Sequence, residues 1–274
     1  MALYCAALLN WKVGINIMND HLPSRWQEVL RHNDLDSFEK LWALQLEWFE
    51  EPNQRRGGWS GVSRCDLDLP DGGKVGVFIK RQENHITRTL LHPFGMSTFI
   101  REIENILRFK KAEVPALEPV YFAVRKVDGD LRAIVCTEAL DGYEPLENLT
   151  GRWLKEGWPD RQTRNRLMKA VASVMARMHD HKIQHNCFYP KHIFVRFAGD
   201  EISIRIIDLE KAKVKVFRRH ASFRDLYALN RHAQGWSRTD RLRFLLLYLG
   251  QDRLNPAAKE LWRRIVKHTI IKAK

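Results

Sequence analysis

The chain has 274 residues, of which 45% are hydrophobic, and its formal net charge at pH 7 is +13. Such a chain can bury a substantial core, so a disordered protein is not expected. The cysteines are scattered without a Cys-x-x-Cys pair, which argues against a zinc centre or a disulfide framework and favours a reducing compartment. No apolar run approaches the roughly 18 residues that cross a bilayer, and residues 1–17 lack the basic start of a signal peptide.

Nearly all of the positive charge lies in the last quarter of the chain. Residues 205–274 contain 18 Lys and Arg against 6 Asp and Glu, a net charge of +12. Such a region favours anionic partners such as phosphates, acidic lipid headgroups or nucleic acid, although a solvated basic helix surface is the alternative. A nucleic-acid surface is the less favoured interpretation, because the interleaved aromatic residues fall in apolar helical patterns that indicate core packing. They are Trp236, Phe244, Tyr248 and Trp262.

The first 140 residues predict a small sheet with one long helix. Helical segments are expected within residues 20–49, where apolar residues recur about one turn apart. A glycine-rich turn follows in RRGGWSGVSRCDL, and the period-2 alternation of VGVFIK predicts a strand that ends at Lys80. A helix is expected over about 97–111, with strands near residues 119–125 and 131–138.

The second half is predicted to be mainly helical. Residues 161–179 place apolar side chains on one helical face. Two short β-rich runs, HIFVRF and ISIRIID, follow on either side of the turn AGDE, and the last 50 residues carry helical patterns such as DRLRFLLLYL and AAKELWRRIVKH. The sequence therefore predicts an α+β fold with a sheet-rich first part and a helix-rich second part.

Three glycines and a lysine are the first candidates for contact with a nucleotide. Gly57, Gly58 and Gly61 precede the strand that carries Lys80. Glycines let backbone amides approach phosphates closely, and a lysine at this place can pair with the α- and β-phosphates. Because GGWSGVS departs from GxGxxG, a simple hairpin is the alternative interpretation.

A carboxylate on the next helix is a candidate partner for Lys80. In FIREIENILRF, Glu102 shares a helical face with Ile106 and Phe109 and is placed to hold the lysine as an ion pair. Glu104 is the competing choice, and an ordinary exposed glutamate is the third interpretation.

The stretch MHDHKIQHNCFYPKHIFV, followed by SIRIIDLEKAK, resembles the catalytic loop and the metal-binding strand of protein kinases. His185 and Cys187 stand where the HRD motif has its histidine and aspartate, and His192 stands at the asparagine position of the loop. Asp208 ends the second β-rich run, where a carboxylate is well placed to hold Mg²⁺.

Further details resemble the lipopolysaccharide kinase (Kdo/WaaP) family, and most closely its InaA-like branch. They are IDLEKAK in place of DFG, His192, Tyr189, and the later runs RDLYALNRH and TDRLRFLLLYL. The resemblance covers roughly residues 50–255. It implies a two-lobed protein-kinase-like fold, with a small antiparallel-sheet N-lobe over residues 50–140 and a larger helical C-lobe over residues 141–274.

Residues 1–49 are expected to be an extension with helices packed on the N-lobe. The resemblance implies ATP and Mg²⁺ as ligands and, as activity, phosphorylation of a sugar of the lipopolysaccharide core or of a related small or lipid-linked acceptor. Glu138 and Leu140, in the hinge, would contact the adenine edge, while Asp208 and His192 would hold the metal. A cytoplasmic location is expected, with peripheral contact at the anionic inner leaflet.

Cys187 occupies the position of the catalytic aspartate. A thiol has a reference pKa of about 8.5, and a thiolate beside phosphates would need an offsetting cation such as Lys191. Three interpretations stay open. The enzyme is active without a full base, because loose phosphoryl transfer depends on positioning and charge; or His185 or His192 substitutes, with His185 favoured as a loop-orienting residue; or the chain is a pseudokinase that binds nucleotide and has a regulatory or stress-response role.

Overall fold

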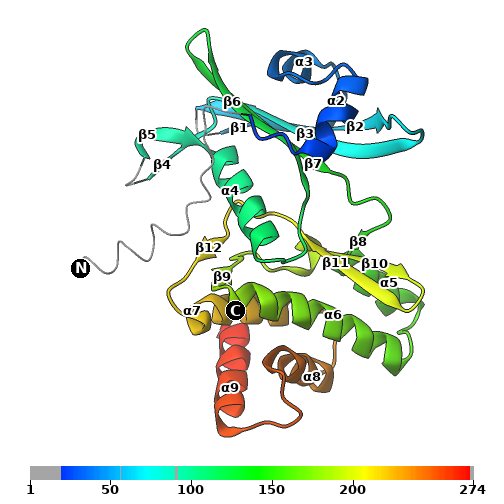
Figure 1. Ribbon diagram of the computed structural model, residues 1–274. Coiled ribbons are helices and arrows are strands. Elements are labelled where there is room, and N and C mark those ends of the chain that lie inside the picture. Colours follow the sequence, from blue (N-terminus) through cyan, green and yellow to red (C-terminus); the bar gives the residue numbers. More distant parts are fainter. Residues whose placement is uncertain (1–19, 56, 90–91, 272–274) are drawn as a thin grey trace. The chain divides into compact units, whose positions relative to one another are not determined.

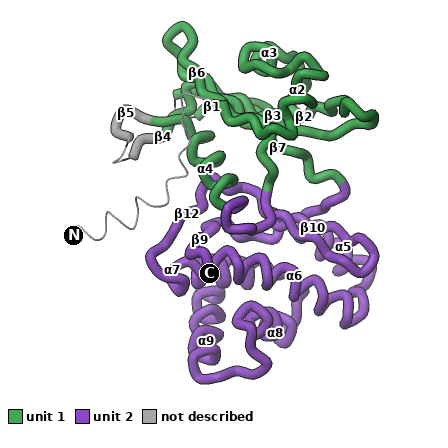
Figure 2. The backbone as a smooth tube through the Cα atoms, viewed as in Figure 1, with its two compact units in different colours: residues 1–108, 117–141 green, residues 109–116, 142–274 purple. Residues whose placement is uncertain are grey.

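The computed structural model describes residues 20–55, 57–89 and 92–271, so residues 1–19 of the expected N-terminal extension lie outside the described residues. The chain separates into two compact units (Figure 2). Residues 1–108 and 117–141 form the first unit, and residues 109–116 and 142–274 form the second, so the division falls within helix α4.

The first unit is built on a five-stranded antiparallel sheet with the strand order β1-β2-β3-β7-β6 (Figure 1). The strands are β1 Trp48–Arg55, β2 Gly58–Asp68, β3 Lys74–Glu83, β6 Pro119–Val127 and β7 Asp130–Glu138. The period-2 prediction for β3 is confirmed, and Val77 and Ile79 are buried. The predicted end at Lys80 is wrong: β3 pairs with β2 and β7 as far as Glu83, so Lys80 lies inside the strand.

Two short helices pack against this sheet. Helices α2 (Ser24–His32) and α3 (Phe38–Ala43) contribute their apolar faces to the core of the first unit. The helical expectation for residues 20–49 is therefore confirmed in part. It fails at Trp48, which begins strand β1 because its backbone pairs with Ser63 of β2.

The helix predicted over about 97–111 is confirmed as α4 (Thr98–Lys111), and its buried side chains include Ile103 and Ile106. A short hairpin, which the sequence did not predict, precedes it. Its strands are β4 Ile86–Thr89 and β5 His92–Ser97.

The three glycines expected near a nucleotide lie in the β1–β2 hairpin. Gly57 has a φ of +82°, a left-handed conformation that glycine adopts without strain. A Cβ atom on Gly58 would lie 1.9 Å from the carbonyl oxygen of Glu83, and one on Gly61 would lie 2.6 Å from the Trp48 ring. The hairpin alone thus requires glycine at these positions, and their contact with phosphates stays a prediction.

Replacing Gly58 with alanine is expected to lower the free energy of unfolding by about 1–3 kcal/mol, because the new methyl group meets backbone atoms that cannot rotate away. Urea denaturation followed by fluorescence measures the change. Gly151→Ala is the control, since its Cβ would meet no atom within 4 Å in helix α5 (Leu146–Glu156); it is expected to stabilise the protein by up to about 1 kcal/mol. Equal effects of the two substitutions would contradict the packing role of Gly58.

The second unit is mainly helical, as the sequence predicts. Its helices are α5 Leu146–Glu156, α6 Arg161–Asp180, α7 Arg218–His232, α8 Arg238–Leu249 and α9 Pro256–Ile271, with the 3₁₀ turn Pro190–His192. Its strands are β8 Glu144–Pro145, β9 Ile183–Gln184, β10 Ile193–Ala198, β11 Glu201–Ile206 and β12 Lys213–Val214. The apolar face predicted for α6 is buried, and β10 pairs with β11 and β8 in a three-stranded sheet. Within the described residues, no helix is long and apolar enough to cross a bilayer.

Candidate functional site

An ion pair joins the strand lysine to the helix glutamate in the first unit. Lys80, paired with Val62 of β2 and Val135 of β7, is fixed on a central strand. Its Nζ atom lies 2.5 Å from Oε1 of Glu102, whose side chain is only 8% exposed. The structure therefore selects Glu102 over Glu104, which the sequence left open.

The end of β7 holds the residues expected to meet adenine. The amide of Glu138 donates to the carbonyl of Glu118, and the amide of Ala139 donates to that of Gly76. The Glu138 carboxylate lies 3.6 Å from Arg25. Because these two amides already donate within the first unit, an adenine contact here would rest on carbonyl oxygens and on Leu140.

In the second unit, a buried carboxylate organises the predicted catalytic loop. Asp225 of α7 accepts hydrogen bonds from the amides of His185 and Asn186, at 2.7 and 2.9 Å. Asp225 is fully buried. These bonds hold the loop where it leaves β9, and they let Asn186 adopt a positive φ of 70°.

A second layer of buried polar groups supports Asp225. Nε2 of His179 lies 3.2 Å from its carboxylate, and Nδ1 of His179 lies 3.0 Å from the Tyr248 hydroxyl. Burial raises the pKa of Tyr248 to about 12, so its hydroxyl keeps its proton. The role of Asp225 was not predicted from the sequence. The motif RDLYALNRH contains it, but no local pattern shows that this aspartate accepts hydrogen bonds from two backbone amides 39 and 40 residues earlier in the chain.

His185 has both ring nitrogens engaged. Its Nδ1 accepts the amide of Cys187 at 3.2 Å, and its Nε2–H donates to the carbonyl of Ile207 at 2.9 Å. Burial lowers the pKa of His185, which keeps the ring neutral. These contacts fit a residue that orients the loop and leave no ring nitrogen to receive a proton from a substrate.

Cys187 is a buried, neutral thiol. Burial raises its pKa, and the neighbouring charge of Asp208 raises it further, while Lys211 and Arg224 act in the opposite direction. The cation that the sequence suggested, Lys191, is not among the groups that lower it. At neutral pH the thiol is therefore protonated, and it is a poor replacement for an aspartate base.

Asp208 and His192 lie together at the end of the β10–β11 hairpin. Nδ1 of His192 donates to the carbonyl of Cys187 at 2.8 Å and lies 3.5 Å from Oδ2 of Asp208. A carbonyl only accepts, so Nδ1 of His192 carries a proton. The Asp208 carboxylate is 34% exposed and its backbone φ is +59°.

These two residues fit a divalent cation only in part. In residues 20–55, 57–89 and 92–271, no group of three or more His, Cys, Asp or Glu side chains is placed to hold a metal. Mg²⁺ prefers oxygen ligands and commonly binds through one or two carboxylates, with water and phosphate oxygens completing the shell. Asp208 therefore suits Mg²⁺ that is held jointly with a phosphate ligand, whereas the His192 imidazole suits it less well.

Comparisons with known proteins bear on the family and the fold of the chain. Residues 39–248 match the model of the lipopolysaccharide kinase (Kdo/WaaP) family. Protein InaA of Escherichia coli K12 is 30% identical over 205 residues, which cover 75% of this chain and 92% of that protein. Lipopolysaccharide core heptose(I) kinase WaaP of the same organism is 30% identical over 159 residues, which cover 55% of this chain and 59% of that protein.

A solved structure, WaaP in complex with acyl carrier protein, has the same fold. It matches with a TM-score of 0.67 and 24% identity, and the match covers 93% of this chain and 98% of that one. The predicted α+β, protein-kinase-like fold with an antiparallel sheet is confirmed.

Proposed function

Because the chain belongs to the lipopolysaccharide kinase (Kdo/WaaP) family, we propose that it is an ATP- and Mg²⁺-dependent phosphotransferase. Its acceptor would be a sugar of the lipopolysaccharide core or a related small or lipid-linked molecule. The observation that carries the proposal is the ion pair of Lys80 with Glu102, two residues 22 positions apart that have the roles of phosphate ligand and orienting carboxylate in kinases.

Each side chain of the proposal has one task. Lys80, held by Glu102, would donate to the α- and β-phosphates of ATP. Asp208 would hold Mg²⁺, and this cation would stabilise the negative charge of the phosphoryl group during its transfer. Glycines of the β1–β2 hairpin, Glu138 and Leu140 would contact the rest of the nucleotide.

The transfer step does not depend on a strong base. The acceptor hydroxyl oxygen forms a bond to the γ-phosphorus, the bond from that phosphorus to the bridging oxygen of ADP breaks, and the hydroxyl proton leaves to water. In a loose transition state little negative charge has to be generated on the attacking oxygen, so positioning and charge stabilisation carry most of the effect. This fits the neutral thiol of Cys187.

The same thiol favours a second candidate function, a pseudokinase. A chain that retains the Lys80–Glu102 pair and Asp208 but has Cys187 in place of the catalytic aspartate would bind nucleotide and transfer phosphate slowly or not at all. Its role would then be regulatory, in a stress response for example. Either function would be exercised in the cytoplasm, with the chain meeting a lipid-linked acceptor at the inner leaflet.

Restoring the aspartate distinguishes the two candidates. If the wild type is an active kinase that lacks a strong base, Cys187→Asp is expected to raise the rate of transfer from ATP to lipopolysaccharide core acceptors by about 10- to 100-fold. This gain is smaller than the usual rate enhancement from a general base, because the transition state is loose. Cys65→Asp, which alters a half-buried thiol on β2, is the control and is expected to give no gain. Bound nucleotide with no transfer by either Cys187 form would instead support the pseudokinase.

A further inference from the structure

A short segment after Asp208 combines dense positive charge with exposed apolar side chains. Residues 211–219 read KAKVKVFRR, five cations with no acidic residue. Val216 is 49% exposed and Phe217 is 52% exposed. Six large hydrophobic side chains are exposed in the part of the chain that the structure describes, and only these two are adjacent in sequence.

Several contacts hold the backbone of residues 211–220, which we call the 211–220 segment. β12 pairs with β9, and the amide of Lys215 donates to the carbonyl of Lys182 at 2.8 Å. Beyond Phe217 the chain enters α7, where Arg218 pairs with Asp180 at 2.5 Å. The two apolar side chains are therefore presented by a fixed backbone, which reduces the entropy lost on binding.

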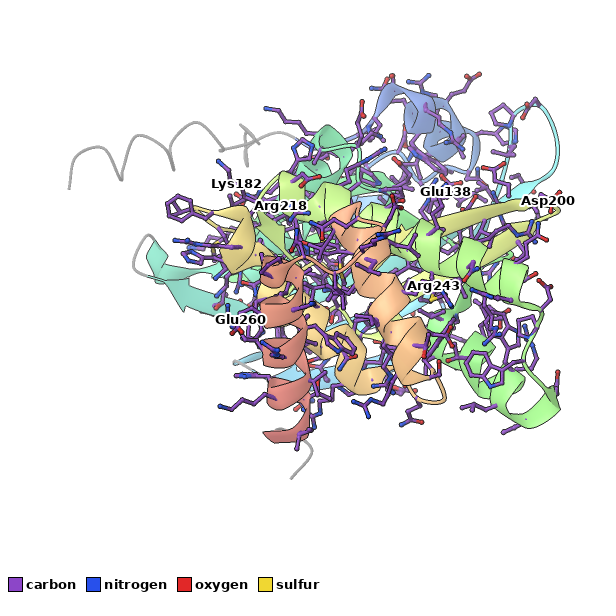
Figure 3. The ribbon with its side chains drawn as sticks, turned by 90° about the horizontal axis from the view of Figure 1, so that it is seen from below. Glu138, Lys182, Asp200, Arg218, Arg243 and Glu260 are labelled. Atoms are coloured by element: carbon purple, nitrogen blue, oxygen red, sulfur yellow. The ribbon has the colours of Figure 1, made fainter. Side chains whose placement is uncertain are left out.

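The charges around the apolar pair are largely uncompensated. Lys182 and Arg218 lie together at one corner of the second unit, while Arg243 lies apart from both (Figure 3). The ion pairs of the described residues engage Arg218, but none engages Lys213 or Lys215. Arg219 packs over the Phe217 ring at 5.2 Å instead of against a carboxylate.

We propose that the 211–220 segment is a docking surface for an anionic lipid bilayer, with Val216 and Phe217 entering the headgroup region and the surrounding cations contacting lipid phosphates. Two contributions to the free energy of peripheral membrane binding add together. Cations are attracted to the anionic leaflet, and apolar side chains enter the interface. Nucleic acid would use the aromatic ring for stacking but gains nothing from the aliphatic Val216, so the pair favours lipid.

Docking there would bring the predicted catalytic loop to the membrane surface. The side-chain amide of Asn186 donates to the carbonyl of Lys211 at 2.7 Å, so the loop and the segment are directly bonded within the second unit. A lipid-linked acceptor would then meet Asp208 and Cys187 close to the headgroups. This consequence rests on the proposed function, whereas bilayer binding by the segment does not.

Sedimentation with phospholipid vesicles tests the surface. Wild type is expected to bind vesicles that contain about a third phosphatidylglycerol, and to bind neutral phosphatidylcholine vesicles far less. Lys213→Glu with Lys215→Glu is expected to weaken binding by about 25-fold or more, since each cation contributes about fivefold. Val216→Ser with Phe217→Ser is expected to weaken it by about tenfold, with no change in net charge.

The matched control lies on another basic surface of the second unit. Arg161, Arg166, Lys169 and Arg243 line a groove at the start of α6 and on α8. Arg161→Glu with Lys169→Glu makes the same change in net charge as the segment variant and is expected to reduce vesicle binding less than about threefold at moderate salt.

Three results would overturn the proposal. The first is no binding of the wild type to anionic vesicles, and the second is an equal loss of vesicle binding in the segment and groove variants. The third is that the protein binds single-stranded DNA through the segment and that this DNA displaces it from vesicles. Stabilisation of the same variants by ATP and Mg²⁺ is measured in parallel and is expected to match wild type. If the segment variants are still stabilised by nucleotide but no longer bind vesicles, the proposed docking surface is supported. If the wild type binds vesicles but is not stabilised by ATP and Mg²⁺, the proposed kinase function is contradicted while the docking surface remains supported.

Discussion

Asp225→Ala is expected to lower the free energy of unfolding by about 3–5 kcal/mol, a large loss for a single substitution. The Asp225 carboxylate accepts from the backbone amides of His185 and Asn186 and lies against His179. Asp225, His179 and His185 are fully buried, and Asn186 is partly buried. Each buried donor left without a partner costs about 1–3 kcal/mol. The predicted catalytic loop should also lose its fixed conformation.

Chemical denaturation of the purified variant measures the loss, and hydrogen exchange at the amides of His185 and Asn186 shows whether the loop opens. Asp252→Ala removes an exposed aspartate between α8 and α9 and is the control; a change within about 0.5 kcal/mol is expected there. Asp225→Asn retains an acceptor oxygen and should fall between the two. A loss at Asp225 no larger than at Asp252 would show that this carboxylate does not organise the loop.

Lys80→Met is expected to weaken ATP–Mg²⁺ binding by about 10- to 100-fold. A hydrogen bond to a charged group contributes about 1.5–3 kcal/mol, and the methionine keeps the length of the side chain without its charge. Isothermal titration of the folded protein with ATP in excess Mg²⁺ measures the change in Kd.

Lys74→Met is the matched control for Lys80. Both lysines lie on β3 and both pair with a carboxylate, but Lys74 pairs with Asp68 at the surface. Because Lys80→Met leaves the Glu102 carboxylate buried without its cation, the double variant with Glu102→Gln keeps the measurement interpretable if the single variant unfolds. Equal affinities in the Lys74 and Lys80 variants would remove Lys80 from the nucleotide site.

The parts of the site that sequence predicted are those set by local periodicity. Alternating apolar residues place Lys80 on a strand, helical spacing places Glu102 on an inward face, and a run ending in Asp208 follows a recognisable loop. Sequence alone left Glu102 and Glu104 as alternatives, since both lie on the same helix. Only the packing of α4 in the first unit decides between them.

The parts that sequence missed depend on contacts between distant segments. Asp225 serves a loop about 40 residues earlier, which no local pattern reveals. Trp48 is extended because β2 pairs with it, although helix α3 ends at Ala43, only five residues earlier. The thiol of Cys187 is neutral because of burial and Asp208, and both result from tertiary structure.

Thermal unfolding in the presence of ATP and Mg²⁺ tests the nucleotide site most directly. A ligand that binds only the folded state stabilises it by about 2.7 kcal/mol at a hundredfold excess over Kd, so we expect a clear rise in the Tm of the wild type at millimolar ATP with Mg²⁺. Asp208→Ala should lose the part of that rise that depends on Mg²⁺, while Asp252→Ala should keep all of it. An unchanged Tm of the wild type under these conditions would contradict both the kinase and the pseudokinase.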